Sequence, residues 1–198
     1  MTTQVSSIYR KKLLNAVLFF AKNTKHVNLT KLSKLLYFLD FTHFNQTGYP
    51  SIGLNYYTFP WGPVPRDFWL EIKDGNVPED FRGKLALIPK TDDLAPNFKE
   101  IEVRAIKGPD LSIFTPRETK ILDDLAFIFR EARAGEISEV SHLPKQPWDI
   151  TIKESGENSL IDYLLSIDEN SEISLDDAKE SLKEHFEAVR NFGPEPTK

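Results

Sequence analysis

The chain has 198 residues, no cysteine and a formal net charge of −5. This length fits one domain, and the lack of cysteine excludes a disulfide framework and thiolate chemistry. Residues 1–150 carry 20 basic and 18 acidic side chains, whereas residues 151–198 carry 5 basic and 12 acidic ones. A near-neutral body with an acidic tail lacks the basic excess typical of DNA-binding proteins, so we expect no strong nucleic-acid binding by the protein alone.

The first predicted element is an amphipathic helix over residues 8–22, capped by Ser6 or Ser7. Asn15 and Lys22 interrupt its apolar run, and no small-residue cleavage site follows it. This pattern predicts neither a signal peptide nor a membrane span, and it favours a cytoplasmic protein without a membrane partner.

A second helix is predicted over residues 30–48, because Gly48 suits the left-handed conformation that ends many helices. Residues 53–59 are expected to be extended, and the sequence FPWGPVP follows over 59–65. Proline fixes φ and lacks an N–H group, so this stretch is predicted to be a stiff corner outside any helix interior or central strand. A third helix is expected to run from Pro65 to about residue 73.

The middle of the chain changes from helical to strand-like patterning. Alternating apolar residues over 84–90 and 100–107 predict a small antiparallel hairpin whose strands are joined by a loop. Thr115, Pro116 and Glu118 then form the pattern of a capping box, which predicts a helix that reaches residue 134.

The remaining segments complete the expected fold. A short helical turn over 136–143 leads into the loop-like sequence PKQPWD, and a last helix is predicted between Ser174 and Gly193. We therefore expect a mostly α, α+β fold with five or six helices and one small antiparallel β-hairpin. Residues 1–150 are expected to form the main domain, and residues 151–198 an acidic helical extension that is packed on it or appended to it.

No motif for catalysis or cofactor binding is visible. The four histidines stand at 26, 43, 142 and 185, and none has the spacing of a metal site. The sequence contains no glycine-rich phosphate loop and no GxSxG motif. We therefore predict no catalytic residue, metal or cofactor, and the weaker alternative of an enzyme stays open.

Four segments, taken in order, resemble one known family. They are KLSKLLYFLDFTHFNQTGYP (31–50), YYTFPWGPVPRDFWLEI (56–72), TPRETKILDDLAFIF (115–129) and EISEVSHLPKQPWD (136–149). Their order is similar to the Panacea domain, also called the SocA-like or phage-associated GepA-like domain, which has a K-L-x-K-L-L-Y helix, a G-P-V corner and a later S-H and P-W segment. The resemblance covers roughly residues 10–150.

The resemblance implies a binding protein and not an enzyme. Panacea-like domains are similar to the antitoxins of two-gene pairs, in which the antitoxin neutralises a protein toxin encoded by the neighbouring gene through direct, stoichiometric contact. It also implies a role in phage defence, and assembly as a homodimer or as a heterotetramer with the toxin. The alternatives are a phage-associated, DNA-linked regulator, an adaptor that delivers the toxin to a protease, or an unrecognised enzyme.

Candidate residues fall into two groups. Exposed tryptophan and arginine often dominate binding interfaces, and acidic side chains suit a basic partner. The partner-binding candidates are Trp61, Arg66, Trp69, Lys73, Asp176, Asp177, Glu180 and Glu184, and the structural candidates are Gly62, Pro63, Val64, His142 and Trp148. Trp61 has two interpretations, which are packing that locks the second helix against the third and direct contact with the toxin.

Overall fold

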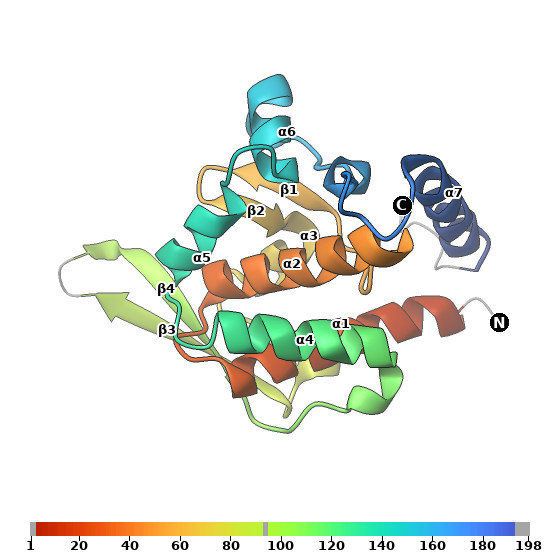
Figure 1. Cartoon of the computed structure of the whole chain (residues 1–198). Helices are drawn as coiled ribbons and strands as arrows, with labels where there is room; N and C mark the ends of the chain where they lie inside the picture. Colours follow the sequence, from red (N-terminus) through yellow and green to blue (C-terminus); the bar gives the residue numbers. More distant parts are fainter. Residues whose placement is uncertain (1–2, 93–94, 193–198) are drawn as a thin grey trace.

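Helix α2 (Leu29–Thr47) lies at the centre of the protein, in contact with α1 (Thr3–Asn23), α4 (Pro116–Ile128) and α5 (Ala134–Ser141). The structure is a computed structural model that describes residues 3–92 and 95–192, and Figure 1 shows α2 running between its neighbours. The described residues form seven α-helices and two small antiparallel sheets of two strands each. The predicted class, mostly α with a little β, is confirmed, although the structure adds one helix and one hairpin to the expected numbers.

Apolar residues occur on several faces of α2, and they account for its central position. Its largest apolar side chains are almost completely buried, among them Leu32, Leu35, Leu36, Leu39 and Phe44. Both ends of the helix are set locally. Asn28 caps the first turn by accepting a hydrogen bond from the backbone N–H of Lys31 at 2.9 Å, and Gly48 ends the helix in the left-handed conformation with a φ of 76°.

The proline-rich corner is a narrow β-ribbon. Strand β1 (Tyr56–Phe59) pairs with β2 (Gly62–Pro65), and α3 (Arg66–Ile72) follows directly. The other edge of β1 is covered by residues 158–161. The backbone N–H of Thr58 donates to Ser159 O at 2.9 Å, and the backbone N–H groups of Asn158 and Ile161 donate to Thr58 O and Tyr56 O. Pro63 and Pro65 are tolerated because they lie in β2, which pairs with β1 on one side and is an edge strand.

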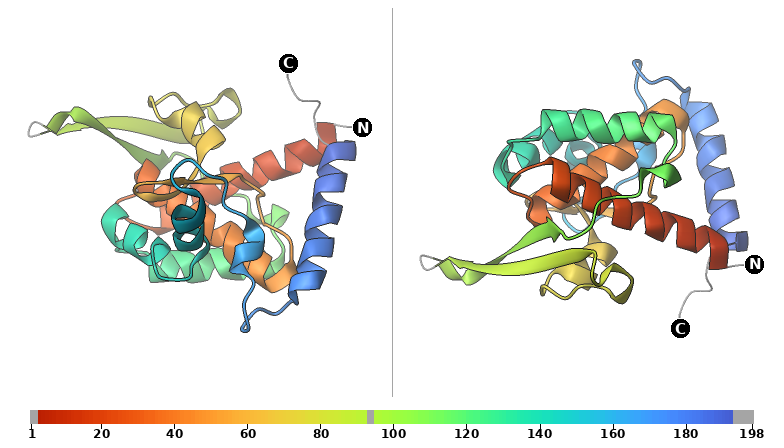
Figure 2. Two further views of the ribbon diagram at one scale, coloured as in Figure 1. Left: turned by 90° about the horizontal axis from the view of Figure 1, so that it is seen from above. Right: turned by 90° about the horizontal axis from the view of Figure 1, so that it is seen from below.

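The second hairpin and the last helix lie at opposite ends of the molecule. Strands β3 (Leu85–Asp92) and β4 (Ala95–Ala105) project from one end, whereas α7 (Leu175–Phe192) packs against α1 at the other (Figure 2). The strands extend into the segment that was predicted to be a loop. Three short 3-10 helices complete the chain, at Glu79–Phe81, Leu111–Ile113 and Tyr163–Ser166 (η3).

Several predicted boundaries are wrong. Helix α1 begins at Thr3, so Ser6 and Ser7 lie inside it and do not cap it. The helix predicted to reach residue 134 is shorter, because α4 ends at Ile128, and the short helical turn predicted over 136–143 is helix α5, which begins at Ala134. The PKQPWD segment, predicted to be loop-like, leads into helix α6 (Pro147–Ser155), which begins at its second proline.

Two predicted helix starts are confirmed. Thr115 and Glu118 form the expected capping box, in which the Glu118 carboxylate accepts from the Thr115 backbone N–H at 2.8 Å. Ser174 accepts from the backbone N–H of Asp177 at 3.2 Å, directly before α7. The predicted end at Gly193 lies outside the described residues.

A buried carboxylate connects α2 to the segment that leads into β1 and to η3. Asp40 is fully buried, and it accepts hydrogen bonds from the backbone N–H groups of Ile52, Gly53 and Leu54 and from the hydroxyl of Tyr56 at 2.9 Å. Tyr163 of η3 donates to the same carboxylate at 3.3 Å. Burial raises the pKa of Asp40, and the donors oppose that rise.

We expect Asp40→Ala to lower the free energy of unfolding by about 3–5 kcal/mol, because it leaves several buried donors without an acceptor. The control is Asp123→Ala on the exposed face of α4, which we expect to change stability by less than about 0.5 kcal/mol. Urea unfolding followed by circular dichroism measures both changes. Equal stability of the two variants would contradict a role for Asp40 as the anchor of this segment.

Candidate functional site

The turn of the β1–β2 ribbon is pressed against α2 and α5. Gly62, which opens β2, has a φ of 98°, a conformation that other residues rarely adopt. A Cβ atom at Gly62 would lie 2.6 Å from Lys34 Cε, 2.7 Å from Ser141 Oγ and 3.0 Å from His142 Nε2. Only glycine therefore fits at this position.

The other residues assigned to the corner meet around the same turn. The carbonyl of Pro63 accepts a hydrogen bond from Lys34 Nζ at 3.1 Å, and Val64 is buried. Trp148 donates from Nε1 to the carbonyl of Phe59 at 3.2 Å, and its ring stacks on His142 with centroids 3.9 Å apart. Three segments that lie far apart in the sequence thus contact one another here.

Trp61 does not contribute to this packing. Its side chain is 75% exposed, so the interpretation that its indole locks the second helix against the third is wrong. The prolines on each side of the Trp61–Gly62 pair do make the corner stiff, but they do not determine whether the indole faces the core. The buried side of the turn is instead formed by Gly62 and the residues that follow it.

A small pocket opens beside the exposed indole. The corner pocket, as we name it, has a volume of about 230 Å³, and its aromatic wall consists of Phe59 and Trp61 from the ribbon and Trp69 from α3. Its other lining residues come from α2, the ribbon, α3 and β4, and include Leu29, Ser33, Lys34, Val64, Lys73, Glu100 and Ile101. The structure therefore brings together three of the partner-binding candidates, namely Trp61, Trp69 and Lys73.

The other partner-binding candidates lie elsewhere. The guanidinium of Arg66 stacks over the ring of Tyr57 at 3.8 Å, and Arg66 is not part of the lining. Asp176, Asp177, Glu180 and Glu184 belong to α7, where Glu184 accepts a hydrogen bond from the hydroxyl of Tyr49 at 2.8 Å. The acidic candidates on α7 are thus separate in the fold from the aromatic candidates at the corner.

Lys34 is a functional candidate that the sequence analysis did not select. Its side chain is 0% exposed, and its ammonium donates to the carbonyl of Pro63 with no carboxylate within ion-pair distance among the described residues. Burial lowers the pKa of Lys34 to about 7. Lys34 is the second lysine of the K-L-x-K-L-L-Y segment, and this place in the family pattern could have identified it. The helical pattern alone did not predict that its side chain is buried.

Lys31, one turn earlier, is buried in a different way. Its ammonium donates to the carbonyls of Lys25, Phe129 and Ala132 at 2.6–2.8 Å and so connects the loops that precede α2 and α5. Burial lowers the pKa of Lys31 to about 8. Lys31 has a full set of acceptors, whereas Lys34 does not.

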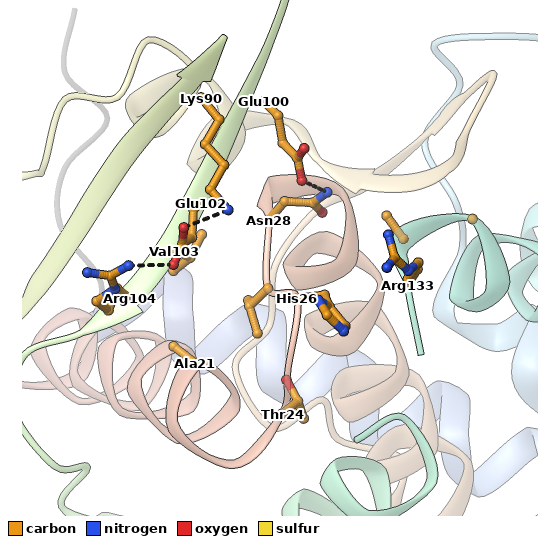
Figure 3. Close-up of a pocket in the computed structure, with 13 residues that line it drawn as sticks. Ala21, Thr24, His26, Asn28, Lys90, Glu100, Glu102, Val103, Arg104 and Arg133 are labelled. Carbon is orange, nitrogen blue, oxygen red and sulfur yellow. Dashed lines mark hydrogen bonds and ion pairs between the residues drawn. The ribbon is translucent and has the colours of Figure 1, made fainter. Parts of the chain in front are cut away.

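A larger, polar groove lies between the β3–β4 hairpin and the starts of α2 and α5, with a volume of about 580 Å³ (Figure 3). Its acids are already engaged: Glu102 pairs with Lys90 at 2.8 Å and Arg104 at 2.9 Å, and Glu100 accepts from Asn28 at 2.7 Å. Figure 3 shows the pairs of Glu102 along the strands, on the side of the groove away from Arg133, and Asn28 at the start of α2. The sequence analysis selected no residue in this groove.

Two further findings concern the parts of the chain that the structure describes. Residues 3–92 and 95–192 contain no group of three or more His, Cys, Asp or Glu side chains that is arranged to hold a metal ion. Over the same ranges, no helix combines the length and the apolar character needed to cross a membrane.

The fold and the corner define a class of small, mostly helical proteins built around a buried K-L-x-K-L-L-Y helix and a G-P-V turn. The family described as antitoxin SocA-like, Panacea domain, matches residues 32–149, which is more than half of the chain. The chain therefore belongs to this family. No curated protein and no solved structure matches it. The family description supports an antitoxin role and a protein partner.

We expect Gly62→Ala to lower the free energy of unfolding by about 3 kcal/mol or more, because it combines backbone strain with a steric clash. Gly83→Ala is the matched control, since Gly83 has a φ of 70° and no atom near its added methyl group. Thermal unfolding of both variants separates the two contributions. If Gly62→Ala and Gly83→Ala lower the free energy of unfolding equally, the steric clash at Gly62 makes no contribution and backbone strain explains both changes.

We expect the Lys34→Met variant to gain stability relative to the parent protein at low pH, where Lys34 is charged, and to gain less at high pH, where it is neutral. The folded protein holds the Lys34 proton with a pKa of about 7, against an ordinary value of 10.5, so the unfolded chain binds more protons between these values. The stability of the parent protein relative to Lys34→Met should therefore rise with pH across this window, by at most about 1.4 kcal/mol per pH unit. Urea unfolding of both proteins at several pH values measures this difference, and a constant difference would contradict burial of the charge.

Proposed function

We propose that this protein is the antitoxin of a two-gene pair and neutralises a protein toxin, encoded by the neighbouring gene, through stoichiometric binding. The observation that carries the proposal is the match to the SocA-like antitoxin family over residues 32–149. Binding without turnover requires a rigid surface and no reactive group. The protein acts by covering or distorting the active surface of the toxin for as long as the complex persists.

The corner supports the proposal as the contact surface. Trp61 is exposed next to Trp69 and Lys73, and the ribbon that carries it is held by the buried contacts of Gly62 and Pro63. A large aromatic side chain on a rigid support is typical of binding hot spots, because little conformational freedom is lost when the partner binds. The indole of Trp61 does not contribute to the packing of the free protein, and we propose that it is buried when the toxin binds.

The acidic face of α7 is a second candidate surface. Asp176 and Glu180 are exposed there, and they suit contact with a basic partner. The helix is packed on the body, since Ala178 is fully buried and Ser181 lies against Gly48. Substitution of the exposed acids tests this surface better than removal of the helix, which would uncover apolar residues.

Co-expression tests the proposed function. The neighbouring gene alone should arrest growth, and this gene should restore growth in proportion to its dose, with a stoichiometric complex recovered from the cells. A harmless neighbour, or rescue without a recoverable complex, would reject the antitoxin proposal. Rescue at strongly substoichiometric levels would instead favour an adaptor that delivers the toxin to a protease, or an enzyme.

Two variants locate the contact surface in the same assay. We expect Trp61→Ala to weaken toxin binding by about 2 kcal/mol or more and to change the free energy of unfolding by less than about 0.5 kcal/mol. Phe127→Ala on α4 is the control, because its ring is 82% exposed and remote in sequence from the corner. Titration calorimetry with the purified toxin measures binding. Full affinity of Trp61→Ala, together with lost affinity of a Glu180→Lys variant, would move the contact to α7.

A further inference from the structure

We propose that the outer edge of strand β4 binds an extended segment of the partner protein as an added strand, with an apolar side chain of that segment in the corner pocket and a polar one over the polar groove. The open edge, as we name it, is the backbone of residues 99–101 on the side of β4 that faces away from β3. This inference rests on the proposed function for the identity of the partner. It adds the conformation and the side-chain pattern that the partner must present.

The chain before α2 begins a third strand beside β4 and leaves it unfinished. The backbone N–H of Val103 donates to Val27 O at 2.8 Å, and Asn28 forms an isolated antiparallel bridge with Glu102. Helix α2 starts at the next residue, Leu29, so the extended conformation ends there. In the part of the chain that the structure describes, β4 belongs to a sheet of two strands, and no strand continues the pairing from Glu102 toward the tip of the hairpin.

The backbone groups of residues 99 and 101 point toward the open edge. In an antiparallel strand, the N–H and C=O groups of every second residue point to the same side. Val103 directs its N–H to Val27, away from β3, so Ile101 and Lys99 direct their backbone groups the same way. Groups of this kind are the ones to which an added strand forms hydrogen bonds.

The opposite edge of the hairpin is protected. Pro89 lies in β3 opposite Ile101, so the N–H that proline lacks is one that would face the outer edge of β3. The ring of Pro89 is also close to the chain at Gly75, where an added Cβ atom would lie 3.2 Å from Pro89 Cγ. On β4, Pro96 limits the usable edge to the residues that follow it. The hairpin therefore offers a partner the open edge of β4 and not the edge of β3.

The corner pocket and the polar groove adjoin at the open edge. Asn28 and Glu100 line both cavities, and the hydrogen bond of 2.7 Å between their side chains is drawn in Figure 3. Ile101 belongs to the corner pocket, whereas Glu102 belongs to the groove. Successive side chains of a strand point to opposite faces of a sheet. A strand added here would therefore place one side chain in the corner pocket and the next over the polar groove.

The linings of the two cavities define these side chains. The corner pocket has a volume of about 230 Å³ and an aromatic wall, so it accommodates roughly one apolar side chain. The groove carries side chains of both charges, which suit polar neighbours; they are Lys90, Glu100, Glu102, Arg104 and Arg133. The preferred segment consequently alternates apolar and polar residues. We commit to an extended segment of the partner protein, in place of a helix or a second copy of this chain.

The test uses the full-length protein and a library of short random peptides displayed on phage. Peptides of about seven residues are long enough to cover the open edge at about 3.3 Å per residue. The most enriched peptides are synthesised with capped ends, and amide hydrogen exchange of the nitrogen-15-labelled protein locates their binding. The amide of Glu100 is the internal reference, because it lies between the two edge amides and faces β3.

Bound peptide should slow the exchange of the Lys99 and Ile101 amides by at least about tenfold and leave that of Glu100 unchanged. Enriched peptides should carry apolar residues at every second position. Lys99→Pro removes a donor from the open edge and should weaken binding by at least about tenfold. Thr91→Pro is the matched control, because Thr91 pairs with Lys99 and directs its N–H to the other edge of the hairpin. Lys99→Ala separates loss of the N–H from loss of the charge, and it should bind as the parent protein does.

Several results would overturn the proposal. They are a library without enriched peptides, enriched peptides that slow neither edge amide, and equal binding to Lys99→Pro and Thr91→Pro. Apolar residues spaced by three and four positions would show a helix in place of a strand. A dimer of the free protein whose edge amides are already slow would show that a second copy occupies the edge. The exchange measurement uses the parent protein, so it decides the question even where Lys99→Pro fails to fold.

The peptide experiment and the co-expression assay fail independently. An edge that binds no peptide, in a protein that still rescues growth, rejects the added-strand inference and leaves the antitoxin role intact. An edge that binds alternating peptides, in a protein that rescues no toxic neighbour, retains the inference about the edge and rejects the antitoxin role.

Discussion

The burial of most of α2 is the constraint on which the rest of the structure depends. A charged side chain on a buried part of a helix must find its partners inside the protein. Lys31, Lys34 and Asp40 are all 0% exposed. Lys31 connects the loops that precede α2 and α5, Lys34 contacts the corner, and Asp40 binds the segment that leads into β1. Each of these charges therefore fixes the position of a different part of the chain.

Lys31, Lys34 and Asp40 differ in the number of hydrogen bonds that their charged groups make. This difference separates the groups that stabilise the fold from a group with a possible use in binding. Asp40 and Lys31 each have several hydrogen-bond partners, which is typical of groups that specify a fold. Among the residues that the structure describes, the Lys34 ammonium has one acceptor and no carboxylate within ion-pair distance, and burial lowers its pKa to about 7. Strain and incomplete satisfaction persist in proteins mainly where binding or regulation uses them. Lys34 lies beside the exposed Trp61, where a partner is expected.

The family match ends at residue 149, but the structure continues to depend on residues beyond it. Residues 158–161 cover the free edge of β1, and the hydroxyl of Tyr163 donates both to Asp40 and to the carbonyl of Leu54 at 2.6 Å. The ring of Tyr163 also stacks on Phe41 with centroids 4.5 Å apart. This part of the acidic segment is thus integrated with the buried centre of the fold, and α7 is added outside it.

The sequence by itself determined the local features, because these depend on neighbouring residues. Apolar periodicity predicted α2, the glycine at 48 predicted its end, and the Thr115–Glu118 pattern predicted a cap that the structure confirms. The family resemblance, carried by the order of four segments, was also readable in advance. The exposure of Trp61, the burial of Lys34 and the pocket between them were decided only by the tertiary structure. Residues at 34, 61–62, 69 and 141–142 meet through helix packing, and sequence spacing carries no information about which side of a turn faces the core.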